Sequence, residues 1–253
     1  MITHVDLFCD YDGVLSPIAP RPQDARLDQK IRDLLEQLSH HHALHLSIVS
    51  GRSLSDIRTR VGIPGITYVG NHGLEIDGPN LNTIQPIPDR MRDALRSLAG
   101  PLQSAMRAYP GVIVEDKALV IALHFRLAEP RQIPLIISEF SAIVADRNGD
   151  HLLRVDEGKC VVEVRPNVDW DKGKAVRFLL ETRHGKDWPA HTLPVYLGDD
   201  ETDEDAFLAL RDHGVTVRVG NPSSTKTAAR HALQDTDEVV VFLDRLLHSL
   251  PGV

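Results

Sequence analysis

The sequence predicts an α/β protein with a doubly wound, Rossmann-like parallel sheet, interrupted by an inserted α+β segment. Short apolar runs alternate with amphipathic helical patterns in the first and last thirds of the chain, which is typical of a parallel sheet covered on both faces. In the middle third, apolar runs follow one another across short turns, which favours antiparallel pairing. A chain of 253 residues is long enough to bury such a core.

The first third supplies the start of the core. The apolar positions from Leu27 to Leu38 share one helical face. Ser53, with Asp56 three residues later, predicts the start of a second helix. Buried strands are expected at 5–9, 45–49 and 66–69, and the turn Gly70–Gly73 follows the last of them.

Gly78 and the prolines that follow it mark a boundary, so we expect the core to comprise 1–77 and 169–253 and the insert to comprise 78–168. Within the insert, the patterns predict helices near 91–106 and 133–144 and strands at 111–115, 119–126, 152–155 and 160–165. The core then resumes with a helix from about Trp170, strands at 193–197 and 215–219, and helices near 206–210 and 239–250.

Composition excludes several classes of protein. The net charge of -8 argues against a general nucleic-acid surface, although it permits a local site for an anionic small molecule. Cys9 and Cys160 lie in apolar runs and are expected to be buried free thiols. No run has the length of a membrane span and no secretion signal is recognisable, so we expect a soluble, cytoplasmic protein without a membrane partner.

Polar side chains follow several of the predicted core strands. Residues just past the carboxyl ends of strands in an open α/β sheet share one crevice, where ligands bind. Carboxylates suit Mg²⁺, while a hydroxyl and an ammonium can hold phosphate oxygens. One carboxylate can attack phosphorus and a second can move protons, so the set favours phosphoryl transfer to Asp10 and then to water. The set comprises Asp10, Asp12, Ser50, Lys172, Asp199 and Asp200.

Each motif also has an ordinary structural interpretation. Asp12-Gly13 alone is a common turn, Ser50-Gly51 a common cap, and a lone lysine such as Lys172 a solvated residue of a first helical turn. Glu204 and Asp205 are expected to be helix-start acids favoured by the macrodipole. The triplet His40–His42 is expected to be a polar helix end, because adjacent helical side chains diverge.

Five segments together resemble the haloacid-dehalogenase phosphatase superfamily, and within it the trehalose-6-phosphate phosphatases. They are FCDYDGVLSPI, SIVSGR, GNHGLEI, VEVRPNVDWDKGKAV and YLGDDETDEDAF, in that order across nearly the whole chain. The resemblance implies a haloacid-dehalogenase core with an inserted substrate-specificity domain, Mg²⁺ as cofactor, and hydrolysis of trehalose 6-phosphate. Val14 departs from the family, which usually has threonine there.

The resemblance also implies roles for individual residues. Asp10 is the expected nucleophile and a Mg²⁺ ligand, and Asp12 is the expected general acid and base and a ligand through its backbone carbonyl. Ser50 and Lys172 are expected to bind the phosphoryl group, and Asp199 to be the third metal ligand. Asp200 and Asp203 are expected to support Asp199, and Gly51, Arg52 and Asn71 to bind phosphate or substrate.

The insert carries the expected sugar contacts. VEDK, ALHFR and EVRP resemble the segments with which this family holds its sugar, and a disaccharide needs many hydrogen-bonding groups. Alternation places several of these side chains on a common face. The candidates are Glu115, Lys117, Arg126 and Glu163, with Arg165 and His124 in addition; as ordinary structure they are solvated strand residues.

Two alternatives to this function stay open. One is a related phosphatase acting on sucrose 6-phosphate or a glucosylglycerol phosphate, and the other is a non-catalytic sugar-phosphate-binding module. We expect a monomer whose partner is a small sugar phosphate, with any coupling to synthesis made through a separate trehalose-6-phosphate synthase.

Overall fold

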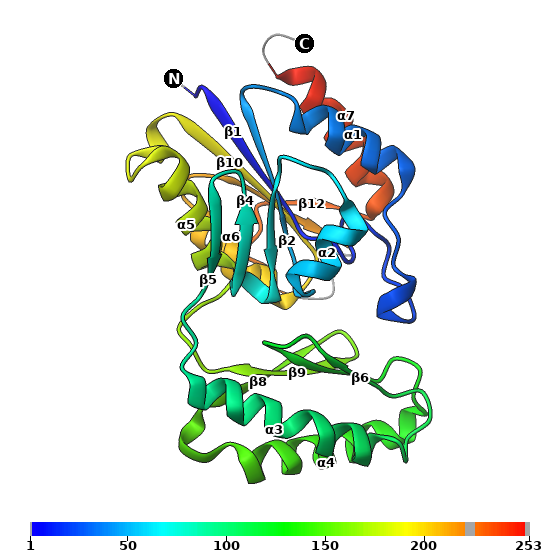
Figure 1. Cartoon of the computed structure of the whole chain (residues 1–253). Coiled ribbons are helices and arrows are strands. Elements are labelled where there is room, and N and C mark those ends of the chain that lie inside the picture. The colour runs from blue at the N-terminus through cyan, green and yellow to red at the C-terminus, as the bar shows by residue number, and fades with distance from the viewer. Residues whose placement is uncertain (1, 221–225, 251–253) are drawn as a thin grey trace. The chain divides into compact units, whose positions relative to one another are not determined.

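The computed structural model describes residues 2–220 and 226–250. The chain forms two compact units, a core of Met1–Ile84 with Trp170–Val253 and an insert of Gln85–Asp169 (Figure 1). The doubly wound α/β fold with an inserted antiparallel segment is therefore confirmed.

The core is built on one mixed sheet. Its strand order is β12-β11-β10-β1-β2-β3-β4-β5, and all neighbours are parallel except β3–β4 and β4–β5. Sequential strands on either side of β1 make the fold doubly wound, because the chain leaves β1 toward β2 and later returns on its other side at β10. The strands are β1 (His4–Cys9), β2 (Leu44–Val49), β3 (Thr67–Gly70), β4 (Glu75–Gly78), β5 (Leu81–Ile84), β10 (Thr192–Gly198), β11 (Val215–Val219) and β12 (His231–Leu233).

Helices cover both faces of this sheet. Alternation along β1 sends Leu7 and Cys9 into one apolar cluster and Phe8 into another. The Leu7 cluster includes side chains from α1 (Gln29–Ser39), α2 (Leu54–Val61) and α7 (Thr236–Ser249). The Phe8 cluster includes side chains from α5 (Lys172–His184) and α6 (Glu204–Leu210).

The insert has its own core. Its antiparallel sheet has the order β6-β7-β9-β8, and one face packs against α3 (Asp89–Met106) and α4 (Ile133–Arg147) through residues such as Leu98, Leu123 and Phe140. The strands are β6 (Ile113–Asp116), β7 (Ile121–His124), β8 (Leu153–Gly158) and β9 (Val161–Pro166).

The structure differs from the sequence expectations at several places. The insert begins at Gln85 rather than at 78, because Leu81–Ile84 pairs with β4 as an added edge of the core sheet. Strand β4 and the two short edge strands β5 and β12 were not predicted from the sequence. Helix α5 begins at Lys172, with Asp171 as its N-cap, rather than at Trp170.

Cys9 is a buried free thiol as expected, whereas the free Cys160 is only partly buried. None of the helices in the described ranges is both long and apolar enough to cross a bilayer.

Candidate active site

The carboxyl ends of three neighbouring strands bring the predicted polar residues to one edge of the core sheet. Cys9, the last residue of β1, lies opposite Ile48 of β2 and Leu197 of β10. The chain continues in register past this point, since the backbone N–H of Asp10 donates to the Leu197 carbonyl at 2.9 Å. The residues that emerge at this edge are Asp10, Ser50 and Asp199, all of them buried.

Lys172 joins the two ends of the sequence. Its Nζ lies 3.1 Å from Oδ1 of Asp10 and 2.7 Å from Oδ1 of Asp203, and its side chain is only 2% exposed. A buried ammonium needs such partners, because an unpaired charge in the interior is costly. The Lys174 ammonium instead lies 3.4 Å from Asp171, so Lys172 is the lysine that enters the site.

Asp203 organises the site rather than offering a free carboxylate. Its Oδ2 accepts hydrogen bonds from the backbone N–H groups of Asp199 and Asp200, at 2.9 and 3.0 Å. Its Oδ1 accepts from the Tyr196 hydroxyl at 2.7 Å as well as from Lys172. Both oxygens are therefore occupied, and Asp203 holds the Asp199 backbone in place. Asp200 caps the short turn Glu201–Asp203 through its own side chain.

Close packing against glycines positions the remaining groups. A Cβ on Gly13 would lie 2.3 Å from the Asp199 carboxylate, and Gly13 itself has a φ of +84°, so this turn requires glycine. A Cβ on Gly173 would lie 2.3 Å from the Asp205 carbonyl. Glycine after Lys172 thus lets α5 approach α6, which brings Lys172 to Asp203.

Three carboxylates form a cluster that fits a divalent cation. Oxygens of Asp10, Asp199 and Asp203 all lie within 4.8 Å of one another. The Lys172 ammonium is paired with Asp10 and Asp203. Oxygen ligands with surplus negative charge suit Mg²⁺. Because the oxygens of Asp203 are taken by hydrogen bonds, Asp10 and Asp199 are the members able to bind an ion.

The charges of this cluster shift the pKa values of its members. Burial raises the pKa of Asp10 well above its ordinary value, and the Lys172 ammonium opposes this rise while Asp203 and Asp199 add to it. Burial alone would lower the pKa of Lys172, but Asp10 and Asp203 outweigh it and keep that pKa above its usual value. Burial would raise the pKa of Asp203, yet Lys172 holds it below its usual range. Lys172 and Asp203 therefore form an ion pair at neutral pH.

Asp12 lies outside this cluster of three carboxylates and pairs with Arg52. Strand β1 ends at Cys9, so strand alternation does not set the direction of Asp12. The Arg52 guanidinium donates to both Asp12 oxygens, from Nε at 2.6 Å and from Nη2 at 2.7 Å. Arg52 also donates to Asp56 at 2.9 Å and to the Pro22 carbonyl at 2.9 Å, and it lies over the Tyr11 ring. This fork fixes the orientation of the Asp12 carboxylate.

The loop after β2 is held against the turn after β3. The Ser50 hydroxyl accepts from the Arg52 N–H at 3.2 Å, and the Ser50 carbonyl accepts from the His72 N–H at 3.0 Å. A Cβ on Gly51 would lie 2.5 Å from the His72 ring. Asn71 and His72 are adjacent non-glycine residues with positive φ, of 48° and 57°, which is a strained backbone. Asn71 also donates to Glu75 at 2.6 Å.

The predicted sugar-binding residues gather in the insert. Pairing of Ala122 with Glu115 and with Glu163 places these two carboxylates on one face of the antiparallel sheet, together with His124 and Arg165. The opposite face is apolar and covered by α3 and α4. Hydrogen bonds in this part of the insert join Lys117 with Glu163 at 2.7 Å, His124 with Glu115 at 2.9 Å, Arg126 with the Lys159 carbonyl at 2.8 Å, and Arg165 with Asp156.

The sequence did not predict the hydrogen-bonding roles of Tyr196 and Glu204. Nothing in the sequence marked Tyr196 as a hydrogen-bond donor to the site, because an aromatic residue in a buried strand usually packs in the hydrophobic core.

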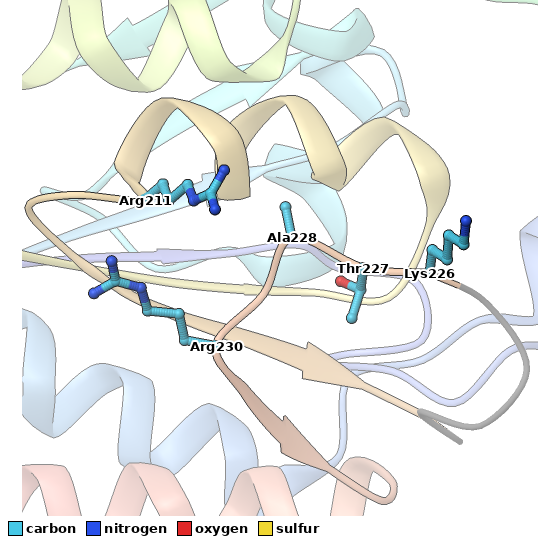
Figure 2. Close-up of a pocket in the computed structure, with 5 residues that line it drawn as sticks. All are labelled: Arg211, Lys226, Thr227, Ala228 and Arg230. Atoms are coloured by element: carbon cyan, nitrogen blue, oxygen red, sulfur yellow. The ribbon is translucent and has the colours of Figure 1, made fainter.

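Glu204 does more than interact with the helix dipole. Its carboxylate accepts hydrogen bonds from Arg218, Thr227 and the Ala228 N–H at 2.7–2.8 Å. These bonds hold one wall of a basic pocket of about 490 Å³ (Figure 2). That pocket contains none of the predicted site residues; it is lined by Arg211, Lys226, Thr227, Ala228 and Arg230.

Comparison with known sequences decides the family. The profile of the family described as Trehalose-phosphatase matches residues 8–238. The chain belongs to this family. A trehalose-phosphate phosphatase of Mycobacterium bovis is 38% identical, over 96% of this chain and 61% of the relative. A probable trehalose-phosphate phosphatase D of Arabidopsis thaliana is 33% identical, over 95% of this chain and 66% of the relative.

The trehalose-phosphatase fold is also recognisable in solved structures. The C-terminal domain of Candida albicans trehalose-6-phosphate phosphatase superposes with a TM-score of 0.82 at 23% identity, covering 98% of this chain and 94% of that chain. At this identity the likeness shows the fold alone. The chain spans about three fifths of the length of the mycobacterial relatives that it matches.

Proposed function

We propose that this chain hydrolyses trehalose 6-phosphate to trehalose and phosphate, with Mg²⁺, through an aspartyl-phosphate on Asp10. The observation that carries the proposal is the buried Lys172 ammonium that bridges Asp10 and Asp203, with Asp199 held beside them. The proposal takes Asp10 as the nucleophile, Lys172 as the cation for phosphoryl oxygens, and Asp10 and Asp199 as metal ligands. Membership of the trehalose-phosphatase family supports the choice of substrate.

The chemistry divides between the two aspartates that follow β1. Asp10 attacks phosphorus, a bond forms between its carboxylate oxygen and phosphorus, and the bond from phosphorus to the sugar oxygen breaks. Asp12 gives its proton to the leaving sugar oxygen. Asp12 then takes a proton from water, whose oxygen attacks phosphorus, and phosphate leaves with the Asp10 carboxylate restored. For both steps one Asp12 oxygen leaves the fork of Arg52, while the guanidinium keeps the other oxygen in place.

Other groups bind and orient the phosphoryl oxygens. The Lys172 ammonium and the Ser50 hydroxyl are proposed to hold them. Asp10, Asp199 and the Asp12 carbonyl would hold Mg²⁺, which, when bound, neutralises charge on the phosphoryl group and favours the ionised form of Asp10. The polar face of the insert sheet, with Glu115, Lys117 and Glu163, is proposed to bind the sugar.

The test is phosphate release by the purified chain with Mg²⁺ and trehalose 6-phosphate, sucrose 6-phosphate or a glucosylglycerol phosphate. We expect saturable release from the trehalose ester, no release by Asp10→Asn, and unchanged release by Asp212→Asn, which alters an exposed aspartate at the end of α6. Preferred turnover of another ester would contradict the substrate, and binding without turnover would indicate a non-catalytic module.

The aspartyl-phosphate has a separate test. In Asp12→Asn the base for the second step is missing, so an activated aryl phosphate should leave the protein with the added mass of one phosphoryl group. The double variant Asp10→Asn/Asp12→Asn should show no added mass. Modification that persists in the double variant would place the nucleophile elsewhere.

A further inference from the structure

A second cluster of titratable side chains lies at the amino ends of the core strands, away from the residues described above. Asp6 of β1 is fully buried there, and oxygen and nitrogen atoms of Asp6, His45 and His184 lie within 4.8 Å of one another. These residues come from β1, β2 and the last turn of α5. The proposed phosphatase chemistry uses none of them.

Further imidazoles surround this cluster. The His45 and His184 ring centroids are 5.3 Å apart, and the His4 ring lies 5.5 Å from His184 and 6.1 Å from His45. The His191 ring is 6.1 Å from His184. Two imidazoles on one tetrahedral zinc, with Zn–N bonds of about 2.0 Å, hold their centroids about 5 Å apart. The rings are thus already spaced for joint coordination.

The surroundings of Asp6 orient its carboxylate. Arg183 donates to Oδ2 at 2.7 Å, and its other nitrogen donates to the hydroxyls of Ser47 and Thr67 at 2.9 and 2.7 Å. Oδ1 faces Nε2 of His184 at 2.7 Å. Such outer contacts are what fix a ligating carboxylate in metal sites. A bound cation would replace the proton that Oδ1 of Asp6 and Nε2 of His184 share.

We infer that Asp6, His45 and His184 form a binding site for a zinc-class transition-metal dication, with water or His4 as a fourth ligand. Two imidazoles and a carboxylate suit Zn²⁺ or Co²⁺ and disfavour Mg²⁺, which prefers oxygen ligands. Because Arg183 already offsets the Asp6 charge, the site holds its ion less tightly than an all-cysteine site does.

Coordination geometry distinguishes this site from the oxygen cluster. Co²⁺ bound tetrahedrally by imidazoles absorbs visible light far more strongly than Co²⁺ surrounded by oxygens in an octahedron. The full chain, in saturating Mg²⁺ to fill the oxygen cluster, is titrated with Co²⁺ and, separately, with Zn²⁺ while the melting temperature is followed. We expect the intense absorption at one Co²⁺ per chain and a rise in melting temperature with Zn²⁺.

Variants decide the assignment. His45→Gln removes a ligand whose ring takes part in no hydrogen bond found within the described residues, so the metal-free fold is retained; His184→Gln is the second variant should His45→Gln misfold. Both should lose the absorption and bind Zn²⁺ at least tenfold more weakly, while His248→Gln on α7 behaves as the original chain. Absorption unchanged in both variants, or absent from the original chain, would overturn the inference.

Discussion

At the residue scale, the orientation of each charged group depends on a partner far away in sequence. Asp12 is held by Arg52, and Lys172 is held between Asp10 and Asp203. Each partner offers donors or acceptors in a defined direction, so its chemical type matters as well as its charge. Arg52 shows this best, because two of its nitrogens contact the two oxygens of Asp12.

Arg52→Lys should slow the proposed reaction through Asp12. Lysine keeps the charge but lacks the planar fork, so the general acid loses its orientation. We expect kcat on trehalose 6-phosphate to fall roughly tenfold or more, with a smaller change in KM. In single turnovers, release of a sugar should be slowed more than release of an activated phenol, whose departure needs no proton. Equal slowing of both would argue for a general structural role of Arg52.

At the element scale, close approach of the backbones brings the groups of the candidate site together. Helix α5 approaches α6 because position 173 has no side chain, and this approach carries the Lys172 ammonium to Asp203. At the other end of α5, Arg183 and His184 tie the helix to Asp6 of β1. One helix is thus fixed to the sheet at both ends, and its placement determines the position of Lys172.

Gly173→Ala should therefore impair both stability and activity. The new methyl group would overlap the Asp205 carbonyl, so α5 and α6 must separate, at a cost of about 1–3 kcal/mol of unfolding free energy. Gly100→Ala is the matched control, since space is open around Gly100 within α3, and it should stabilise the fold by up to about 1 kcal/mol. Urea unfolding and phosphate release measure both effects. Unimpaired activity in Gly173→Ala would contradict this account.

The network at the other end of α5 predicts a pH-dependent effect. Burial would raise the pKa of Asp6, but His184 and Arg183 outweigh burial and hold it below its usual value. The stabilisation is therefore complete above the unfolded pKa of about 3.9 and is lost as the pH falls through the lower folded pKa. Asp6→Asn should destabilise the metal-free protein by roughly 3 kcal/mol at pH 7, because Arg183 loses its buried partner.

The difference between Asp6→Asn and the original chain should stay constant from pH 7 to about pH 5 and shrink only below about pH 4. Urea unfolding at several pH values measures it, with the exposed Asp24→Asn as control. A difference that disappears already near pH 6 would mean that His184 protonation, rather than Asp6 ionisation, carries the stabilisation.

At the scale of the whole molecule, the chain consists of two separately packed units. The insert is one continuous stretch, Gln85–Asp169, and every residue of its buried apolar cluster comes from within that stretch. The core, in contrast, is assembled from two stretches separated by the insert. The insert can therefore vary its polar face without disturbing the site at the strand ends.

Residues 85–169 expressed alone should fold. Their core is complete within the segment, so we expect the circular dichroism of an α+β domain and a cooperative urea transition. Phe140→Ala in the same fragment should remove about 3–5 kcal/mol and abolish that transition, because Phe140 is fully buried. A non-cooperative fragment that gains structure only when the core is added would refute independent folding.

Local patterns in the sequence were sufficient for the architecture and for most of the candidate site. Alternating β and α periodicity predicted the doubly wound sheet, and polar residues after Cys9, Val49 and Gly198 predicted which edge carries the site, because strand ends in a parallel sheet converge. Short edge strands such as β12 were not predicted, because three residues show too little periodicity to identify a strand.

Only the tertiary structure showed which partners those residues have. Asp10 and Asp12 look alike in sequence, yet one lies beside Lys172 and the other beside Arg52. The bond from Tyr196 to Asp203 and the gathering of histidines around Asp6 depend on strand register and helix placement. Local propensity and periodicity are properties of neighbouring residues, whereas charge pairing depends on distances that exist only once the sheet has been assembled.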